Sequence, residues 1–271
     1  MNESLKQIFE KARNPRQTLF FPYICLGYPN YSLSLSSARA ALKAGAAGLE
    51  LGLPFSDPIA DGPTLQMATQ KALRQGTQPR DVFKLIWTLR KEGFQQSLLV
   101  MSYANLIEQM GWETFSRELE KVQGNGAIIP DLPLEKYHSS GKALLKRNLD
   151  LIPFVAPTSN PQRVKKVDAL KAPFLYYVSV TGVTGARKTL PLGLLNDLHK
   201  LKRDLQTPLV VGFGISSPEQ AAQVGRVADG VIIASALIQL ISKTPKSRIP
   251  RAVESYCRQV LRRLQPRNSQ S

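Results

Sequence analysis

The sequence predicts an α/β protein: a single (β/α)8 TIM barrel with one extra helix at the N-terminus. Short apolar runs bounded by turn residues recur along the 271 residues, and helical patterns fill the intervals between them. There are eight such runs, and eight strand–helix units fit a barrel of about 250 residues. We expect one domain over residues 1–271, with the extra helix at about 1–17 and a flexible tail at about 265–271.

The eight runs are the expected strands of the barrel. Strands buried on both faces read as nearly continuous apolar segments, which is how these runs read. In chain order they are Phe20–Cys25, Ala47–Leu51, Leu98–Met101, Ala127–Pro130, Leu151–Val155, Phe174–Val178, Leu209–Gly212 and Gly230–Ala234. An open doubly wound sheet is the alternative, but no dinucleotide fingerprint follows the first strand.

Helices between the strands carry recognisable start and stop signals. In "SLSLSSARAALKAG", Leu35, Ala38 and Leu42 share one face and Gly45 ends the pattern. In "SSPEQAAQVG", Ser217 and Gln220 have the spacing of a capping box, with a proline at the first helical position.

Composition and charge limit the partners and the location of the chain. No apolar run approaches the roughly 20 residues that span a bilayer, so we expect no membrane span and a cytoplasmic (or plastid stroma) location. The net charge of +16 is scattered and lacks a nucleic-acid-binding motif, which predicts a plain basic surface and no nucleic-acid partner. A polyanion or an acidic protein remains the alternative. Cys25 and Cys257 have no disulfide or metal spacing and are expected to be free thiols.

Three carboxylates crowd the stretch "ELGLPFSDPIADGP" at Glu50, Asp57 and Asp61. Alternation along "GLELG" turns the flanking leucines toward the helices and Glu50 toward the barrel interior, near its catalytic rim. A buried ionised carboxylate is costly unless it is paired or used. Interior pairing of Glu50 and turn chemistry at the two aspartates are the structural alternatives.

Other catalytic groups are scarce. The eight expected strands contain no lysine, and His138 and His199 fall in helix-like segments, so a Schiff base and a histidine-bound metal are disfavoured. Glycines gather after the late strands, at Gly182, Gly185, Gly212 and Gly214, where barrels often bind phosphate; simple turns are the alternative. Carboxylate acid–base chemistry assisted by tyrosine hydroxyls remains, with no metal.

The segments "LELGLPFSDPIADGPTLQ", "YANL", "DLPLE", "VSVTGVTGAR" and "GFGISSPEQ" together resemble the tryptophan synthase alpha subunit family, in order and over essentially the whole chain. The resemblance implies a lyase that cleaves indole-3-glycerol phosphate to indole and glyceraldehyde 3-phosphate. It also implies a beta-subunit partner in an αββα heterotetramer, with pyridoxal phosphate on the beta subunit and no cofactor on this chain.

Residue roles follow from the same resemblance. Glu50 matches the family's general acid/base, and Asp61 matches the carboxylate that steadies the indole N–H. The implied substrate-binding residues are Tyr23, Tyr103, Tyr176, Thr184 and Phe213; the phosphate-binding residues are Gly185, Gly214, Ala234 and Ser235; and Asp57 and Pro58 lie in the partner-facing loop. For Tyr103, a core residue with a satisfied hydroxyl is the alternative.

The sequence departs from the family pattern at several positions. Ala234 replaces a usual glycine at the phosphate site, where a Cβ could crowd the phosphate or require a different φ, and Val180 replaces a usual polar residue. Tyr23 and Tyr28 differ without removing a catalytic group. Ala234 and Val180 favour one alternative, a weakly active or inactive alpha-like subunit that mainly activates the beta subunit. A second alternative, another phosphate-handling barrel of the same pathway, is weakened by the motifs "LELG" and "DPIADGP".

Overall fold

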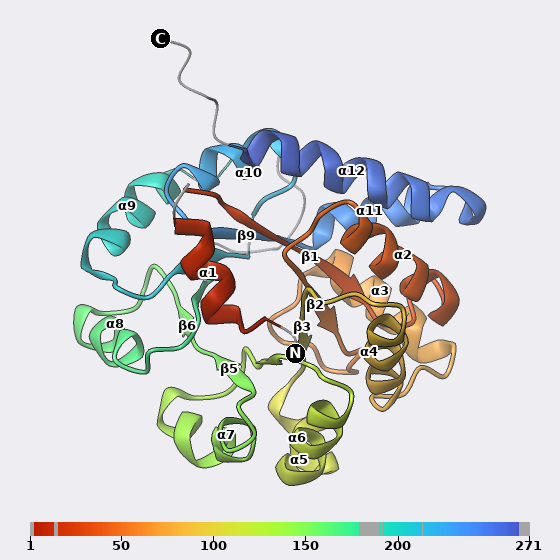
Figure 1. Cartoon of the computed structure of the whole chain (residues 1–271), viewed down its shortest axis with the longest axis horizontal. Coiled ribbons are helices and arrows are strands. Elements are labelled where there is room, and N and C mark those ends of the chain that lie inside the picture. The colour runs from red at the N-terminus through yellow and green to blue at the C-terminus, as the bar shows by residue number, and fades with distance from the viewer. Residues whose placement is uncertain (1–2, 14–15, 179–189, 191, 213, 266–271) are drawn as a thin grey trace.

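The computed structural model describes residues 3–13, 16–178, 190, 192–212 and 214–265. Within these residues, nine strands form one parallel sheet in the order β5-β4-β3-β2-β1-β9-β8-β7-β6, wrapped into a nearly closed barrel (Figure 1). The strands are β1 Leu19–Cys25, β2 Gly48–Gly52, β3 Ser97–Met101, β4 Gly126–Ile128, β5 Asp150–Ile152, β6 Phe154–Val155, β7 Leu175–Tyr177, β8 Leu209–Val211 and β9 Gly230–Ile233. Each of the eight predicted runs contains strand, so the barrel prediction is confirmed.

The fifth predicted strand is divided at Pro153 into β5 and β6. The β5 segment pairs with β4, whereas the β6 segment pairs with β7. Proline has no N–H to give to a ladder, but its carbonyl still accepts a hydrogen bond from the Tyr176 N–H at 2.9 Å. One strand therefore changes neighbours at Pro153, and the barrel keeps its eight-strand plan.

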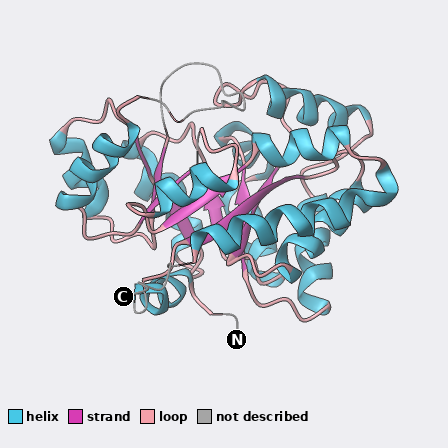
Figure 2. Cartoon of the chain, turned by 90° about the horizontal axis from the view of Figure 1, so that it is seen from above, coloured by secondary structure: helices cyan, strands magenta, loops and turns pink. Residues whose placement is uncertain are grey.

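Helices surround the barrel on its outside (Figures 1 and 2). They are α1 Leu5–Arg13, α2 Tyr31–Lys43, α3 Pro63–Arg74, α4 Asp81–Lys91, α5 Ala104–Met110, α6 Trp112–Lys121, α7 Tyr137–Leu145, α8 Pro161–Asp168, α9 Leu194–Asp204, α10 Pro218–Gly225, α11 Ser235–Lys243 and α12 Ile249–Leu264, with short 3-10 turns at Leu134–Lys136 and Lys246–Arg248.

The predicted helix signals act as local caps. The stop residue Gly45 has φ +106°, a conformation that glycine adopts at little cost. The Ser217 side chain accepts a hydrogen bond from the Gln220 N–H, as a capping box requires. The reciprocal bond differs from the prediction, because the Gln220 side chain accepts from the N–H of Ser216 at 2.7 Å. The cap therefore also fixes the residue before the helix, which lies in the pocket described below.

The N-terminal helix α1 lies across the N-terminal end of the barrel, as Figure 1 shows. Its Phe9 ring lies 6.1 Å from Phe21 of β1 and 5.5 Å from Phe174, which precedes β7. Aromatic packing of this kind adds to the stability gained from burial. The predicted extra helix thus closes the barrel end opposite the catalytic rim.

The remaining composition predictions agree with the structure where it describes them. Cys25 and Cys257 are free and buried, and His138 and His199 are exposed. No helix in the described part of the chain is long and apolar enough to cross a membrane.

Candidate functional site

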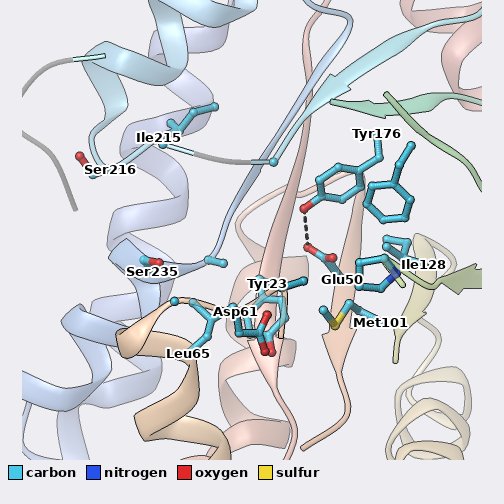
Figure 3. Close-up of a pocket in the computed structure, with 17 residues that line it drawn as sticks. Tyr23, Glu50, Asp61, Leu65, Met101, Ile128, Tyr176, Ile215, Ser216 and Ser235 are labelled. Atoms are coloured by element: carbon cyan, nitrogen blue, oxygen red, sulfur yellow. Dashed lines mark hydrogen bonds between the residues drawn. The ribbon is translucent and has the colours of Figure 1, made fainter. Parts of the chain in front are cut away.

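A pocket opens at the C-terminal ends of the strands, where barrel enzymes place their active sites (Figure 3). It brings together residues from most of the barrel. Its lining comprises Tyr23, Glu50, Ala60, Asp61, Gly62, Leu65, Met101, Ile128, Pro130, Phe154, Tyr176, Gly212, Gly214, Ile215, Ser216, Ala234 and Ser235.

Glu50 lies in the middle of β2 and faces this pocket, as alternation predicted. Its side chain is 3 % exposed. The Tyr176 hydroxyl donates to Glu50 Oε2 over 3.5 Å (Figure 3), a long and therefore weak hydrogen bond. Burial, and secondarily the charge of Asp61, raise the pKa of Glu50 to about 8. Glu50 therefore holds a proton at neutral pH and can give it away.

Asp61 occupies the loop between β2 and α3. Its backbone is anchored by a bond from the Asp61 N–H to the Pro58 carbonyl and by one from the Gln66 side chain to the Asp61 carbonyl. Burial raises the pKa of Asp61 to about 6, and hydrogen bonding from Tyr103 opposes that rise. At neutral pH Asp61 is mostly ionised, so the two carboxyl groups of the pocket hold different protonation states.

Two tyrosines reach the pocket by the same geometry. In the β1–β2 pairing Tyr23 is opposite Glu50, and its hydroxyl lies over Gly52, where a Cβ would come within 2.0 Å of it. In the β7–β8 pairing Tyr176 is opposite Val210, and its hydroxyl lies over Gly212, again 2.0 Å from a Cβ position. In each case the glycine stands two residues beyond the opposed residue and leaves room for the phenol. Gly212 was one of the glycines predicted to form a phosphate site. In the structure, its lack of a side chain makes room for Tyr176.

Tyr103 does not line the pocket. It is fully buried, its ring stacks on Phe55 at 5.2 Å, and its hydroxyl accepts a hydrogen bond from the Ala60 N–H at 3.1 Å. It thereby holds the loop that carries Asp61. Its hydroxyl also hydrogen-bonds the Asp61 side chain. These contacts fit the alternative of a core tyrosine with a satisfied hydroxyl, and a direct role of Tyr103 in substrate binding stays a prediction.

The predicted phosphate residues that the structure describes lie together. Gly214, Ala234 and Ser235 line the pocket, with Ser216 beside them, and Figure 3 shows Ser216 and Ser235 at the opposite end of the pocket from Tyr176. Gly214 has φ +79°, which favours glycine. Ala234 has φ −111°, outside the left-handed region that favours glycine, and crowding of the phosphate by its methyl group stays a prediction.

The remaining predicted site residues fall into two groups. Thr184, Gly185 and Phe213, together with Gly182 and Val180, fall outside the described residues. Asp57 is exposed on the loop between β2 and α3, where it accepts a hydrogen bond from the Ser56 hydroxyl, and Pro58 is partly exposed beside it.

Sequence reasoning missed the apolar wall of the pocket, formed by Met101, Ile128 and Phe154. In a parallel sheet, residues in register face the same side; Glu50 is in register with Leu99, two residues before Met101, and Met101 is in register with Ile128. The register between strands, which the sequence alone does not give, is needed to identify this wall.

The described residues contain no group of three or more His, Cys, Asp or Glu side chains that could hold a metal ion. The pocket offers a protonated and an ionised carboxyl group, two phenol hydroxyls, an apolar wall, and small residues at the start of α11. Such a site suits an aromatic substrate that carries a phosphate and reacts by proton transfer.

Comparison with known proteins agrees with this geometry. Residues 9–264 match the family model described as the tryptophan synthase alpha chain. A tryptophan synthase alpha chain from Chloroflexus aggregans is 40% identical over 257 residues, covering 95% of this chain and 96% of the relative. A solved Legionella pneumophila tryptophan synthase alpha chain superposes with a TM-score of 0.89 at 31% identity, covering 99% of both chains. A Mycobacterium tuberculosis tryptophan synthase structure gives 0.87 at 30% identity, covering 97% of this chain and 99% of the other. The chain belongs to the tryptophan synthase alpha chain family.

Proposed function

We propose that Glu50 and Asp61 divide the acid–base work of indole-3-glycerol phosphate cleavage, the lyase reaction of this family. The observation that carries the assignment is geometric: two carboxyl groups line one pocket, that of Glu50 buried on β2 and that of Asp61 partly exposed on the following loop. Burial raises both pKa values, to about 8 for Glu50 and to about 6 for Asp61. An acid that must donate and a carboxylate that must stay charged need such different environments.

The reaction balances with these two groups. Protonated Glu50 gives its proton to C3 of the indole ring, which becomes an indoleninium cation, and ionised Asp61 stabilises the positive charge near the ring N–H. Glu50, now a carboxylate, takes the proton of the side-chain hydroxyl next to the bond that breaks. That carbon–carbon bond then cleaves, its electron pair returns to the ring, and the hydroxyl carbon becomes the aldehyde of glyceraldehyde 3-phosphate. Glu50 ends the cycle protonated, ready for the next turnover.

The rest of the pocket positions the substrate. Met101, Ile128 and Phe154 supply an apolar surface for the indole ring, and Gly214, Ala234 and Ser235 receive the phosphate at the start of α11. The family assignment and the complete carboxylate pair favour a cleaving enzyme over a subunit that only activates its partner. They also exclude the other phosphate-handling barrels considered from the sequence.

We further propose that the partner is a tryptophan synthase beta subunit in an αββα assembly. On the loop between β2 and α3, at the same end of the barrel as the pocket, Ile59 is 82 % exposed beside Asp57 and offers an apolar side chain that a partner could cover. In this proposal pyridoxal phosphate belongs to the beta subunit and this chain carries no cofactor. The bacterial sources of the relatives support a cytoplasmic location.

Indole release from indole-3-glycerol phosphate by the purified chain, with and without a beta subunit, tests the proposal. Glu50→Gln keeps the shape of the side chain and removes the transferable proton, so cleavage should fall by about 10²-fold or more while the protein stays folded. Asp61→Asn should also be severe. Retention of most of the wild-type rate by Glu50→Gln would show that another group performs the proton transfers.

A further inference from the structure

Two adjoining cavities lie at the end of the barrel opposite the catalytic pocket. Both include Arg16 and Thr18, so they meet along the segment that leads into β1. Thr18, Pro208 and Asp229 each precede a strand directly, which places the cavities at the N-terminal ends of β1, β8 and β9. Their volumes are about 550 and 310 Å³, within the range of roughly 300–1,000 Å³ typical of ligand sites.

Cationic side chains from separate parts of the chain converge on these cavities. They come from the end of α1, the segment before β1, the last turns of α9 and α12, and the turn after α10. The cations are Arg13, Arg16, Lys202, Arg226, Arg262 and Arg263, and the acidic lining residues are Glu219 and Asp229.

Both acids are already engaged. Arg263 forms an ion pair with Glu219 at 3.4 Å, and Lys202 pairs with Asp229. The other four arginines have no ion pair to a carboxylate among the described residues. The lining therefore keeps an excess of positive charge that its own acids do not neutralise.

Two of these arginines are held in place by backbone carbonyls. Arg16 donates from Nη2 to the carbonyl of Arg226 at 2.9 Å, and Arg13 donates from Nη2 to the carbonyl of Gln206 at 3.3 Å. A guanidinium has five N–H donors, so these bonds orient the group without using all of its donors. Such fixed forks match phosphate oxygens better than a flexible ammonium does.

We propose that these cavities form a binding site for a compact oligophosphate, such as inorganic tripolyphosphate or the phosphate chain of a nucleotide, separate from the catalytic pocket. The charge is concentrated around a concave surface, and Phe9 is the one aromatic residue in the described lining. Single-stranded nucleic acids are usually bound along an extended groove with several stacking rings. A short polyanion fits the site better.

Titration calorimetry of the full chain with tripolyphosphate at about 0.15 M salt, where charges more than a Debye length away are screened, tests the site. Arg226 and Arg262 are exposed and have no place in the catalytic machinery, so the double variant R226Q/R262Q should fold and cleave substrate normally. We expect one tripolyphosphate per chain, bound about ten-fold or more weakly by this variant. R226K/R262K, which keeps the charge and loses the forks, should fall between the two.

The matched control is R74Q/R80Q, which removes the same charge at two exposed arginines outside both cavities. Its affinity should stay within about two-fold of the wild type, because the loss of net charge alone is weakly felt in salt solution. Excess glycerol 3-phosphate, which occupies the catalytic phosphate site, should not displace tripolyphosphate.

Four outcomes would overturn the proposal. Equal weakening in both double variants would indicate a diffuse basic surface. Displacement by glycerol 3-phosphate would place the ligand in the catalytic pocket. A third outcome is that the wild type binds no measurable tripolyphosphate while R226Q/R262Q has a lower thermal stability. These arginines would then stabilise the fold by offsetting helix dipoles and would not bind a ligand. Tighter binding of a single-stranded RNA oligonucleotide at the same arginines would assign the surface to nucleic acid.

Discussion

At the scale of single residues, burial rather than residue type separates the two carboxyl groups of the pocket. Glu50 is held on a strand inside the barrel, whereas Asp61 is partly exposed on a loop. Desolvation is the largest cause of both raised pKa values, and it acts more strongly on Glu50. The charge of Asp61 adds to the rise at Glu50, so the two groups titrate as a coupled pair.

Cleavage should therefore show a bell-shaped pH dependence. As pH falls through about 6, Asp61 gains a proton and no longer stabilises the cation; as pH rises through about 8, Glu50 loses the proton it must donate. A pH profile of kcat/KM measures both limbs, because kcat/KM reports the pKa values of the free enzyme. Because a substrate phosphate also titrates near pH 6, the alkaline limb is the diagnostic one. It should shift to lower pH in Asp61→Asn if residual activity permits, and an unmoved limb would contradict the coupling.

Ala234 supports a second prediction at this scale. Its φ of −111° lies outside the left-handed region that favours glycine, so the cost we expect from the methyl group is crowding of the phosphate at the start of α11. Ala234→Gly should tighten binding of glycerol-phosphate analogues by up to about ten-fold, the effect of partially losing one charge-assisted hydrogen bond. Free indole, which has no phosphate, is the control ligand in calorimetry. Equal phosphate affinity in both proteins would show that the methyl group does not crowd the phosphate.

Residues of the site differ in how well the sequence could predict them. The inward direction of Glu50 follows from alternation along β2, which is a local property. The support that Tyr103 gives to the loop depends on a contact with Ala60, 43 positions away in the sequence, and no local pattern encodes that contact. The pKa values depend on burial by the whole barrel. The sequence indicated that a charge on Glu50 would be costly, but the size of the shift depends on contacts between distant segments.

At the scale of elements, Arg90 joins the end of α4 to the starts of β3 and β4. Its guanidinium donates to the carbonyls of Gln123, Phe94 and Gln96 and to the Asn125 side chain at 2.8–3.0 Å. Burial lowers the pKa of Arg90 to about 10, which leaves it charged at neutral pH. The Asn125 side chain in turn accepts from the Leu98 N–H of β3 at 2.8 Å.

Loss of this junction should destabilise the protein strongly. Arg90→Gln leaves several partly buried acceptors without donors, and we expect the free energy of unfolding to fall by about 3 kcal/mol. Urea denaturation provides the measurement. Arg74→Gln, at an exposed arginine without such bonds, is the control and should change stability by less than about 0.5 kcal/mol. A similar small change for Arg90→Gln would mean that water replaces the guanidinium without penalty.

Element boundaries show what sequence patterns lack. All eight strands were located, because their apolar runs are local, but the division of the fifth strand at Pro153 was not predicted. Proline alone does not reveal which neighbours pair on its two sides. That pairing involves β4 and β7, which are distant along the chain.

At the scale of the whole molecule, one end of the barrel carries the catalytic pocket and the loop between β2 and α3, and the other carries α1 and the arginine-lined cavities. The net charge of +16, which composition could not assign to a location, is thus partly concentrated at the end opposite the pocket. A partner bound at the catalytic end leaves this basic surface free.

Association with a beta subunit should depend on Ile59. Ile59→Asp should weaken binding about ten-fold or more, because covering a large apolar side chain contributes roughly 1.5–3 kcal/mol and a buried carboxylate adds a cost. Surface plasmon resonance with a beta subunit measures the effect. Leu145→Asp is the control: Leu145 is 39 % exposed at the end of α7, away from the loop. Matching losses in the two variants would argue against this loop as the docking surface.

The change of neighbours at Pro153 has a counterpart in β1, whose first residues pair with β9 and whose last residues pair with β2. The wall of the barrel therefore consists of two arcs, one from β1 through β5 and one from β6 through β9 back to β1. The backbone hydrogen bonds between the strands of one arc can open while those between the strands of the other arc stay intact. In deuterium exchange the amides should accordingly fall into two sets with different protection, and β1, which belongs to both arcs, should exchange with the slower set.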